Sequence, residues 1–282
     1  MSALDAHHHL WDPRVRDYPW MAAPALDPIR RPYGLQELRD RAAAAGVERT
    51  VLVQTVPDEA ETEEFLALAS SSGGLIAGVV GWVELTDPGV ADALARLRAL
   101  PGGQCLVGVR HQVQDESDPG WLSRPAVRRG LRTVAEAGLA YDLLVLVPQL
   151  PEALTAVRDL PEGRFVLDHA AKPPIAAGAM EPWADALAEL ARLPNVSCKL
   201  SGLVTEARWD DWDAERIRPY ADHVLASFGP DRVMFGSDWP VCELAASYAE
   251  VRGLADELLE GLSPSERDAV LWTTATRVYF TD

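Results

Sequence analysis

Cysteine is scarce in this chain, and the sequence has neither a long apolar run nor a leader-like N-terminus. The three cysteines, Cys105, Cys198 and Cys242, are far apart and form no C-x-x-C pair, which argues against a disulfide framework and a zinc ribbon. No uninterrupted apolar run of about 18 residues occurs, so we expect no transmembrane helix. The N-terminus reaches a histidine cluster without a basic segment followed by an apolar one, which predicts a cytoplasmic protein.

Basic residues are also in short supply. Lysine and arginine total 26 against 43 aspartates and glutamates, and the formal net charge is −17. A chain of this charge repels nucleic-acid phosphates and anionic membrane surfaces, so we expect neither as a partner. Only Lys172 and Lys199 are lysines. In a sequence that so strongly prefers arginine, these two become candidates for positions that arginine cannot fill.

Segments with helical and strand character alternate along the whole chain. Eight strand-like runs are found, at Leu4–Trp11, Arg49–Thr55, Leu75–Val83, Cys105–Gln112, Ala140–Leu146, Arg164–His169, Asn195–Ser201 and Arg232–Ser237. Helix-like segments lie near Leu35–Ala45, Ala60–Ser71, Ala91–Leu100, Ala126–Ala137, Glu152–Asp159, Trp183–Arg192, Ala214–Ser227 and Leu244–Leu262.

This alternation favours parallel strand pairing through right-handed crossovers. A (β/α)8 TIM barrel needs about 250 residues, so residues 1–282 predict one barrel domain. The alternative is a doubly wound open sheet, which the absence of G-x-G-x-x-G after the first strand disfavours. An extra C-terminal helix is predicted over Pro264–Phe280, where Ser263 and Glu266 form a capping box.

The first strand carries a histidine cluster, L-D-A-H-H-H-L-W. Side chains of a strand alternate between its faces, so Asp5, His7 and His9 are predicted on one face and His8 on the other. Two imidazoles spaced in this way are typical of metal or catalytic sites. The alternatives are a chance cluster and an expression tag, but a tag would be a longer run flanked by linker residues.

Polar residues gather where the predicted strands end. The pairs are Arg110-His111, Asp168-His169, Lys199 with Ser201, and Ser237-Asp238. Active sites of TIM barrels lie at the carboxyl ends of the strands, so we expect these side chains to meet the histidines there. Asp238 could accept a proton from water or bind a metal ion. Tyr18 and Trp20, in a proline-rich loop, could cover the pocket or only anchor the loop.

The motifs L-D-A-H-H-H-L-W-D, V-G-V-R-H-Q-V-Q-D-E, V-L-D-H-A-A-K-P, C-K-L-S-G-L and V-M-F-G-S-D-W-P-V resemble those of amidohydrolase-related proteins. This family includes L-fuconolactonase, L-rhamnonolactonase and related sugar-lactone hydrolases. The resemblance extends from Asp5 to Tyr279 and implies a (β/α)8 barrel and lactone hydrolysis. It also implies that His7, His9, His169 and Asp238 are site residues.

We therefore expect a hydrolase that opens the lactone of a sugar acid, with Asp238 as the general base and histidines stabilising the oxyanion. Arg110, His111, Lys199 and Trp239 are the predicted substrate-binding residues. We further expect a monomer or homodimer whose partner is a small-molecule lactone.

The metal requirement has two interpretations. His7, His9 and Asp238 could hold a single Zn²⁺. The fifth strand, A-Y-D-L-L-V-L, however lacks the histidine that mononuclear amidohydrolases commonly add, so we expect that no cofactor is required. The rival functions are a metal-dependent hydrolase or decarboxylase on the same barrel, and a non-catalytic barrel that binds a metabolite.

Overall fold

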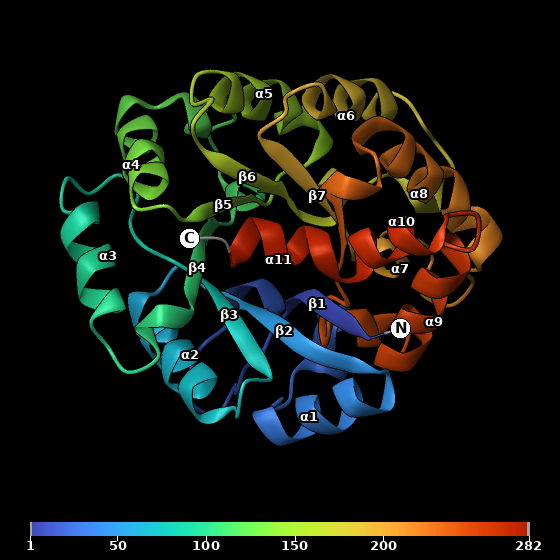
Figure 1. The fold of residues 1–282 in the computed structure, drawn as a ribbon, viewed down its shortest axis with the longest axis horizontal. Helices are drawn as coiled ribbons and strands as arrows, with labels where there is room; N and C mark the ends of the chain where they lie inside the picture. Colours follow the sequence, from blue (N-terminus) through green and yellow to red (C-terminus); the bar gives the residue numbers. More distant parts are fainter. Residues whose placement is uncertain (1, 281–282) are drawn as a thin grey trace.

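The structure of the protein, a computed structural model, describes residues 2–280. Its eight strands form one sheet in the order β1 to β8, and each neighbouring pair is parallel. A parallel bridge between His8 and Trp239 closes the ring. The predicted (β/α)8 barrel is confirmed, with the strands at the centre and the helices around them (Figure 1). The strands are β1 Ala3–His8, β2 Val47–Val53, β3 Ile76–Gly81, β4 Leu106–His111, β5 Ala140–Leu143, β6 Arg164–Leu167, β7 Val196–Leu200 and β8 Val233–Phe235.

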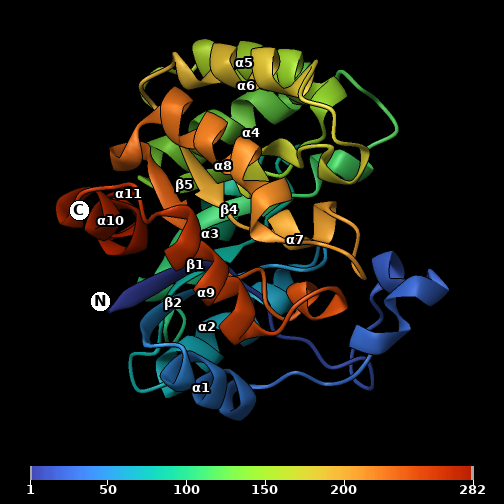
Figure 2. The same ribbon diagram turned by 90° about the vertical axis from the view of Figure 1, so that its right-hand side faces the viewer.

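Helices connect successive strands on the outside of the barrel (Figure 2). They are α1 Leu35–Ala44, α2 Glu59–Ser71, α3 Val90–Arg98, α4 Pro125–Glu136, α5 Leu150–Arg158, α6 Trp183–Ala191, α7 Leu203–Glu206, α8 Ala214–Phe228 and α9 Tyr248–Leu258. No helix among the described residues is long and apolar enough to cross a membrane.

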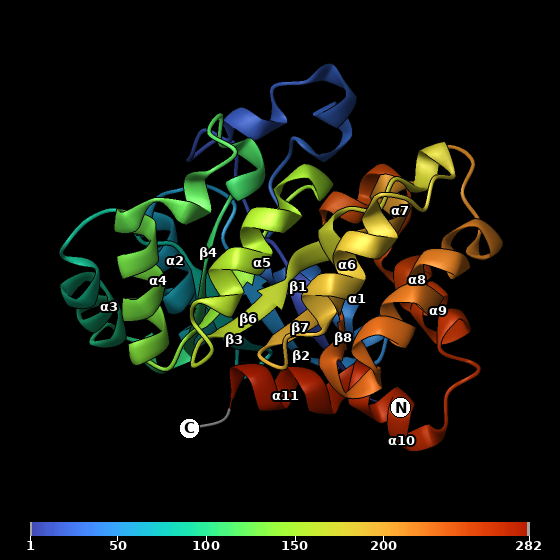
Figure 3. The ribbon, with the colours of Figure 1, turned by 90° about the horizontal axis from the view of Figure 1, so that it is seen from above.

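The predicted C-terminal helix is present, divided into α10 Pro264–Asp268, a π-helical turn Ala269–Thr273 and α11 Thr274–Tyr279. The Ser263–Glu266 capping box opens it as expected. Helix α11 lies across one end of the barrel, opposite the N-terminal loop (Figure 3). Ala275, Val278 and Tyr279 of α11 join the apolar residues inside the barrel, so the amino ends of the strands are plugged.

The prediction that Asp5 shares one face of β1 with His7 and His9 is wrong. The pairing of β1 with β2 has a register shift between Asp5 and His8, and this irregularity breaks the strict alternation of side chains. Leu4 and Ala6 face the barrel interior, while Asp5 accepts hydrogen bonds from the Ser237 amide and the Tyr248 hydroxyl, each at 2.8 Å. Asp5 therefore fastens β1 to the segment after β8 and to α9, outside the barrel interior.

Candidate active site

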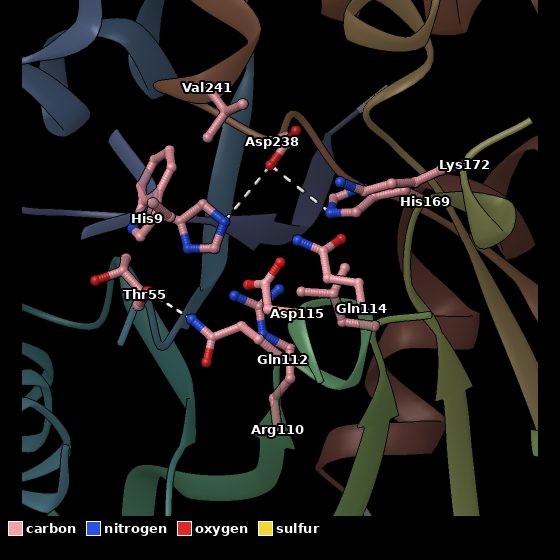
Figure 4. A pocket seen from close by; sticks show the side chains of 12 residues that line it. His9, Thr55, Arg110, Gln112, Gln114, Asp115, His169, Lys172, Asp238 and Val241 are labelled. Carbon is pink, nitrogen blue, oxygen red and sulfur yellow. Dashed lines mark hydrogen bonds and ion pairs between the residues drawn. The ribbon is translucent and has the colours of Figure 1, made fainter. Parts of the chain in front are cut away.

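Three imidazoles surround one carboxylate at the carboxyl ends of the strands. Asp238 Oδ1 lies 3.5 Å from His9 Nε2, 3.8 Å from His7 Nε2 and 3.9 Å from His169 Nε2. His7 and His9 come from the end of β1, His169 follows β6, and Asp238 follows β8. Figure 4 shows His9 and His169 on opposite sides of Asp238. All four side chains are at least 94% buried, so their interactions are only weakly screened by water.

The hydrogen bonds of His9 fix where its proton lies. His9 Nδ1 contacts the Val53 carbonyl at 2.7 Å, and a carbonyl only accepts, so Nδ1 carries the proton. Burial lowers the pKa of His9, which is therefore neutral near pH 7 with a lone pair on Nε2. His7 Nε2 lies 3.1 Å from His9 Nε2 and 3.4 Å from Arg110 Nη1. On its other side, His7 Nδ1 lies 3.1 Å from Lys199 Nζ, a donor, and 3.3 Å from Asp168 Oδ1, an acceptor, so these contacts fit either tautomer of His7.

His169 enters the site on a left-handed turn. His169, Ala170, Ala171 and Lys172 have φ values of 51°, 49°, 58° and 55°, a conformation that costs residues other than glycine about 1 kcal/mol or more each. The Trp183 indole donates to the Ala170 carbonyl at 2.7 Å and helps to hold the turn. Backbone strain of this kind is concentrated at functional sites, and here it directs both His169 and Lys172 toward the pocket.

Two glycines allow the strands to approach the imidazoles closely. A Cβ atom on Gly202, which has φ +66°, would lie 2.7 Å from His169 Nδ1. A Cβ on Gly236 would lie 2.8 Å from His7 Cβ. Both distances are shorter than van der Waals contact, so neither position accepts a larger residue without displacing a histidine of the site.

The carboxylate of Asp238 is ionised despite its burial. Burial raises the pKa of a carboxyl group, but His169, the hydrogen bond to His9 and the positive charge of Lys172 together outweigh this effect and hold the pKa of Asp238 below its ordinary value. Burial also lowers the pKa of His169 to about 4. Near neutral pH the site thus combines a carboxylate that can accept a proton with neutral imidazoles.

A second polar layer lies directly beneath the histidines. Lys199 Nζ lies 2.5 Å from Asp142 Oδ2 and 2.9 Å from Asp168 Oδ1, and the three side chains have no exposed surface. Arg110 donates to Asp168 Oδ2 at 3.0 Å and to the side-chain oxygen of Gln54. Tyr279 of α11 donates to Asp142 from below, at 2.9 Å. The layer therefore links the catalytic end of the barrel to its plug.

Above the histidines lies a cavity of about 110 Å³, which adjoins an outer cavity of about 540 Å³. Trp20, Gln114, Asp115, His169, Lys172, Asp238 and Val241 line both cavities. The outer cavity continues past Trp209 and Glu206. The site can therefore admit a small ring at the histidines while its substituents extend outward.

Comparison with known proteins places the chain in a family. The sequence profile of the amidohydrolase family matches residues 4–281. The chain belongs to the amidohydrolase family. It is 41% identical to an L-fucono-1,5-lactonase of Burkholderia ambifaria over 88% of this chain and 83% of that protein. It is 40% identical to an L-fucono-1,5-lactonase of Burkholderia multivorans over 98% and 95% of the two chains.

A solved structure supports the same placement. A crystal structure of an amidohydrolase from Burkholderia multivorans with bound zinc matches this amidohydrolase with a TM-score of 0.93 at 39% identity. The match covers 99% of each chain. The family resemblance that the sequence motifs indicate is therefore confirmed.

The amidohydrolase brings five of the predicted site residues together at the pocket. His9, Arg110, His169 and Asp238 line it, and His7 lies directly against them. Three other predicted residues are not brought to the pocket lining; they are His111, Trp239 and Lys199.

Strand alternation explains His111, since Arg110 faces the barrel interior and the next residue must face outward. The His111 ring stacks on Trp121 with centroids 4.2 Å apart and accepts from the Trp82 indole at 3.0 Å. Trp239 is fully buried, packs edge-on against Tyr33 and donates to Glu243 at 2.9 Å. Lys199 does face the interior, but below His7.

Gln112 and Gln114 are absent from the predicted site although the structure places them in the pocket lining. Gln112 and Gln114 follow Arg110 at intervals of two residues. The alternation of side chains along β4, continued past the end of the strand, could therefore have predicted that both face the pocket. Asp168 directly precedes a predicted site histidine. The pairing of its carboxylate with Lys199 and Arg110 depends on contacts between distant strands.

The donor atoms of the site fit a divalent metal ion. His7, His9 and Asp238 offer ligand atoms 3.1 to 3.8 Å apart. Ligands of a tetrahedral zinc ion lie about 3.3 Å from one another, given metal–nitrogen distances near 2.0 to 2.1 Å. His7, Asp168 and His169 form a second, separate group of possible ligands. The residues could thus hold one metal ion at the floor of the pocket.

Proposed function

We propose that this amidohydrolase opens the lactone ring of a sugar acid, with Asp238 as the general base. The observation that carries the proposal is an ionised carboxylate, that of Asp238, which faces three neutral imidazoles at the floor of the pocket. Among the described residues it forms no ion pair with a lysine or an arginine. The lactonases of two Burkholderia species support it through their similarity over most of the chain. Our sequence-based expectation of a lactone hydrolase agrees with both observations.

The charges of the pocket favour an uncharged lactone. Among the described residues that line it, Arg110 already pairs with Asp168, and Lys172 lies 3.9 Å from Glu206. Asp115 and Asp238 add two carboxylates. An anionic substrate would need cations that are free to bind it, whereas a polyhydroxylated ring needs hydrogen-bonding groups. The hydroxy acid formed on ring opening is anionic, so the same charges assist its release.

The hydrogen bonds suggest a role for each group. His9 Nε2 and Asp238 are both acceptors and together orient the attacking water, whose proton passes to Asp238 as its oxygen bonds to the carbonyl carbon. In the tautomers that carry the proton on Nε2, His7 and His169 donate to the developing oxyanion. The ring C–O bond then breaks, and the proton held by Asp238 passes to the departing alkoxide oxygen.

We propose that these groups work without a required metal ion. His7, His9 and Asp238 are the residues that would hold such an ion, which when bound would polarise the carbonyl and lower the pKa of a bound water. A ligand role for His7 needs a lone pair on Nε2. Asp168 beside Nδ1 favours that lone pair, whereas Lys199 beside Nδ1 favours a proton on Nε2, which can be donated to an oxyanion. The proposal is supported by β5, Ala140–Leu143, which adds no histidine to the set.

A screen of aldonic 1,5- and 1,4-lactones tests the function. Ring opening releases a proton, so a pH indicator follows turnover, with and without chelator and with Asp238→Asn as the control. We expect rapid opening of at least one neutral sugar lactone and none above background with the control. Turnover of carboxylated substrates with loss of carbon dioxide would favour a decarboxylase, and binding without turnover would favour a metabolite-binding barrel. A cytoplasmic location and a monomeric or homodimeric state stay predictions.

A further inference from the structure

Two polar side-chain atoms at the pocket are buried without a hydrogen-bond partner among the described residues. They are Oε1 of Gln114, an acceptor, and Nε1 of Trp20, a donor. Both residues line the inner and the outer cavity, so both lie where the two cavities meet. Burial of such a group without a partner costs about 1 to 3 kcal/mol, which makes each orphan atom a feature to explain.

The neighbouring glutamine shows what a structural role looks like. Gln112 also lines the pocket, but its oxygen accepts from Gln54 at 3.0 Å and its nitrogen donates to the Thr55 carbonyl at 2.7 Å. The oxygen and the nitrogen of the Gln112 side chain are therefore both bonded to protein, and they link the end of β4 to the end of β2. Gln114 makes no such link through its oxygen, although Figure 4 shows its side chain extending into the pocket toward Asp238 and His169.

The tryptophans give the same contrast. Six other indoles donate to protein acceptors, namely those of Trp11, Trp82, Trp183, Trp209, Trp212 and Trp239. Trp20 lies in the single-turn 3-10 helix Pro19–Met21 and packs edge-on against Trp11 with centroids 5.4 Å apart, so its ring has a defined place. Its buried N–H has no acceptor.

The backbone around Gln114 is equally well fixed. The Gln114 amide donates to the Leu144 carbonyl at 3.0 Å, and the preceding carbonyl, of Val113, accepts from the Gln149 side chain at 2.7 Å. These bonds anchor the turn Val113–Asp115 on the end of β5. The orphan oxygen is thus held beside the catalytic groups by a rigid support, as expected for a recognition element.

We propose that Gln114 and Trp20 are specificity-determining residues that read ring hydroxyl groups of the lactone. A hydroxyl donates to Gln114 Oε1, and a hydroxyl oxygen accepts from Trp20 Nε1. The inference rests on the proposed function and extends it from the reacting carbonyl to the hydroxyl pattern of the ring. A lactone that lacks the matching hydroxyl leaves a buried polar atom unpaired, which is the strongest form of rejection available to a small site.

The test uses pairs of sugar lactones that differ by one hydroxyl, deoxygenated at each ring carbon in turn. The measured quantity is the ratio of kcat/KM for the hydroxylated and deoxy members of a pair. We expect wild-type protein to prefer the hydroxylated member by on the order of 10-fold at one or two positions. Gln114→Met and Trp20→Phe should each bring one of these ratios close to 1. Gln114→Glu, which keeps an acceptor oxygen, should retain the preference.

Gln112→Met and Trp209→Phe are the matched controls, since both remove polar atoms that are already bonded to protein. They should change activity on both members of a pair equally, and thermal unfolding confirms that each variant is folded. If the Gln114→Met and Trp20→Phe variants are active and keep the wild-type ratios of kcat/KM, the role of these two residues is wrong and the proposed function stands. Wild-type protein that opens no lactone would overturn both this proposal and the proposed function.

Discussion

The barrel contains two polar layers with similar residues and opposite electrostatic design. In the lower layer every carboxylate has a cation, because Asp142 and Asp168 both lie within 2.9 Å of Lys199 and Asp168 also accepts from Arg110. In the upper layer the ion-pair partners of Asp238 among the described residues are imidazoles. The lower layer is closed off from solvent, while the upper layer opens to the pocket.

This difference separates support from chemistry. Paired and hydrogen-bonded charges resist change, because breaking a buried pair leaves an uncompensated charge. A carboxylate surrounded by neutral rings remains free to take a proton. The contacts of His7 Nδ1 with Lys199 and Asp168 join the two layers.

Substitution of Asp238 should produce the largest effect on activity. Asp238→Asn keeps the shape of the side chain but cannot accept the proton of water, so turnover should fall roughly 10²- to 10⁴-fold, the usual contribution of a general base. Lactone opening at saturating substrate measures the loss, and circular dichroism checks the fold. Full turnover by a folded Asp238→Asn protein would remove Asp238 from the mechanism.

Substitution of Lys199 should produce the largest effect on stability. Lys199→Met leaves Asp142 and Asp168 buried without their shared cation, and we expect a loss of about 3 to 5 kcal/mol in the free energy of unfolding. The sequence suggests instead that this lysine binds substrate, which would change KM and leave the fold stable. Urea unfolding decides between the two.

Lys172→Met is the matched control, because the side chain of the second lysine is 25% exposed and its nearest carboxylate is 3.9 Å away. It should change stability by less than about 1 kcal/mol. Equal destabilisation by the two substitutions would contradict the division into a supporting layer and a reactive layer.

Loss of the Tyr279 hydroxyl should have a smaller effect. Tyr279→Phe removes the donor that α11 offers to Asp142, and a hydrogen bond to a charged group contributes about 1.5 to 3 kcal/mol to stability. Tyr220→Phe removes a bond at 3.2 Å to the Ala179 carbonyl and should cost only about 0.5 to 1.5 kcal/mol. Unfolding free energies of the two variants in parallel give the comparison.

The fold and the upper layer were accessible from the sequence, because both follow from local patterns. The alternation of helices and strands predicts the barrel, and the rule that barrel sites lie at the carboxyl ends of strands brings His7, His9, His169 and Asp238 together. Strand parity places Lys199 in the interior as well. The alternation of side chains does not show how far along the barrel axis a side chain lies, so it could not show that Lys199 lies beneath the pocket lining.

The remaining features depend on irregular backbone and distant contacts. The register shift in β1 turns Asp5 away from His7, and no residue in L-D-A-H-H-H predicts this shift. The left-handed turn that begins at His169 contains no glycine, which is the usual signal for positive φ. Tyr279 reaches Asp142 only because α11 folds back across the barrel, a tertiary contact between residues 137 positions apart.

Removal of metal should have the smallest effect on activity. A metal ion at His7, His9 and Asp238 would need lone pairs on both Nε2 atoms. The bond from His9 to Val53 leaves such a lone pair, but His7 Nδ1 lies beside both Lys199 and Asp168, and β5 adds no further histidine to the set. We therefore expect exhaustive chelation to change lactonase turnover by less than about 2-fold, a difference of under about 0.4 kcal/mol in the activation free energy.

Single substitutions of His7 and His9 also test whether a metal ion is required. If the imidazoles act as separate hydrogen-bonding groups, His7→Asn and His9→Asn should slow turnover and leave a measurable rate, because the other groups remain. If they act as metal ligands, each substitution should release the metal and abolish activity, because only two protein ligands would remain. Metal content and rate measured on the same samples separate the cases. Activity that disappears with chelator and returns with added Zn²⁺ would show that the upper layer is a metal centre, with a lone pair on His7 Nε2.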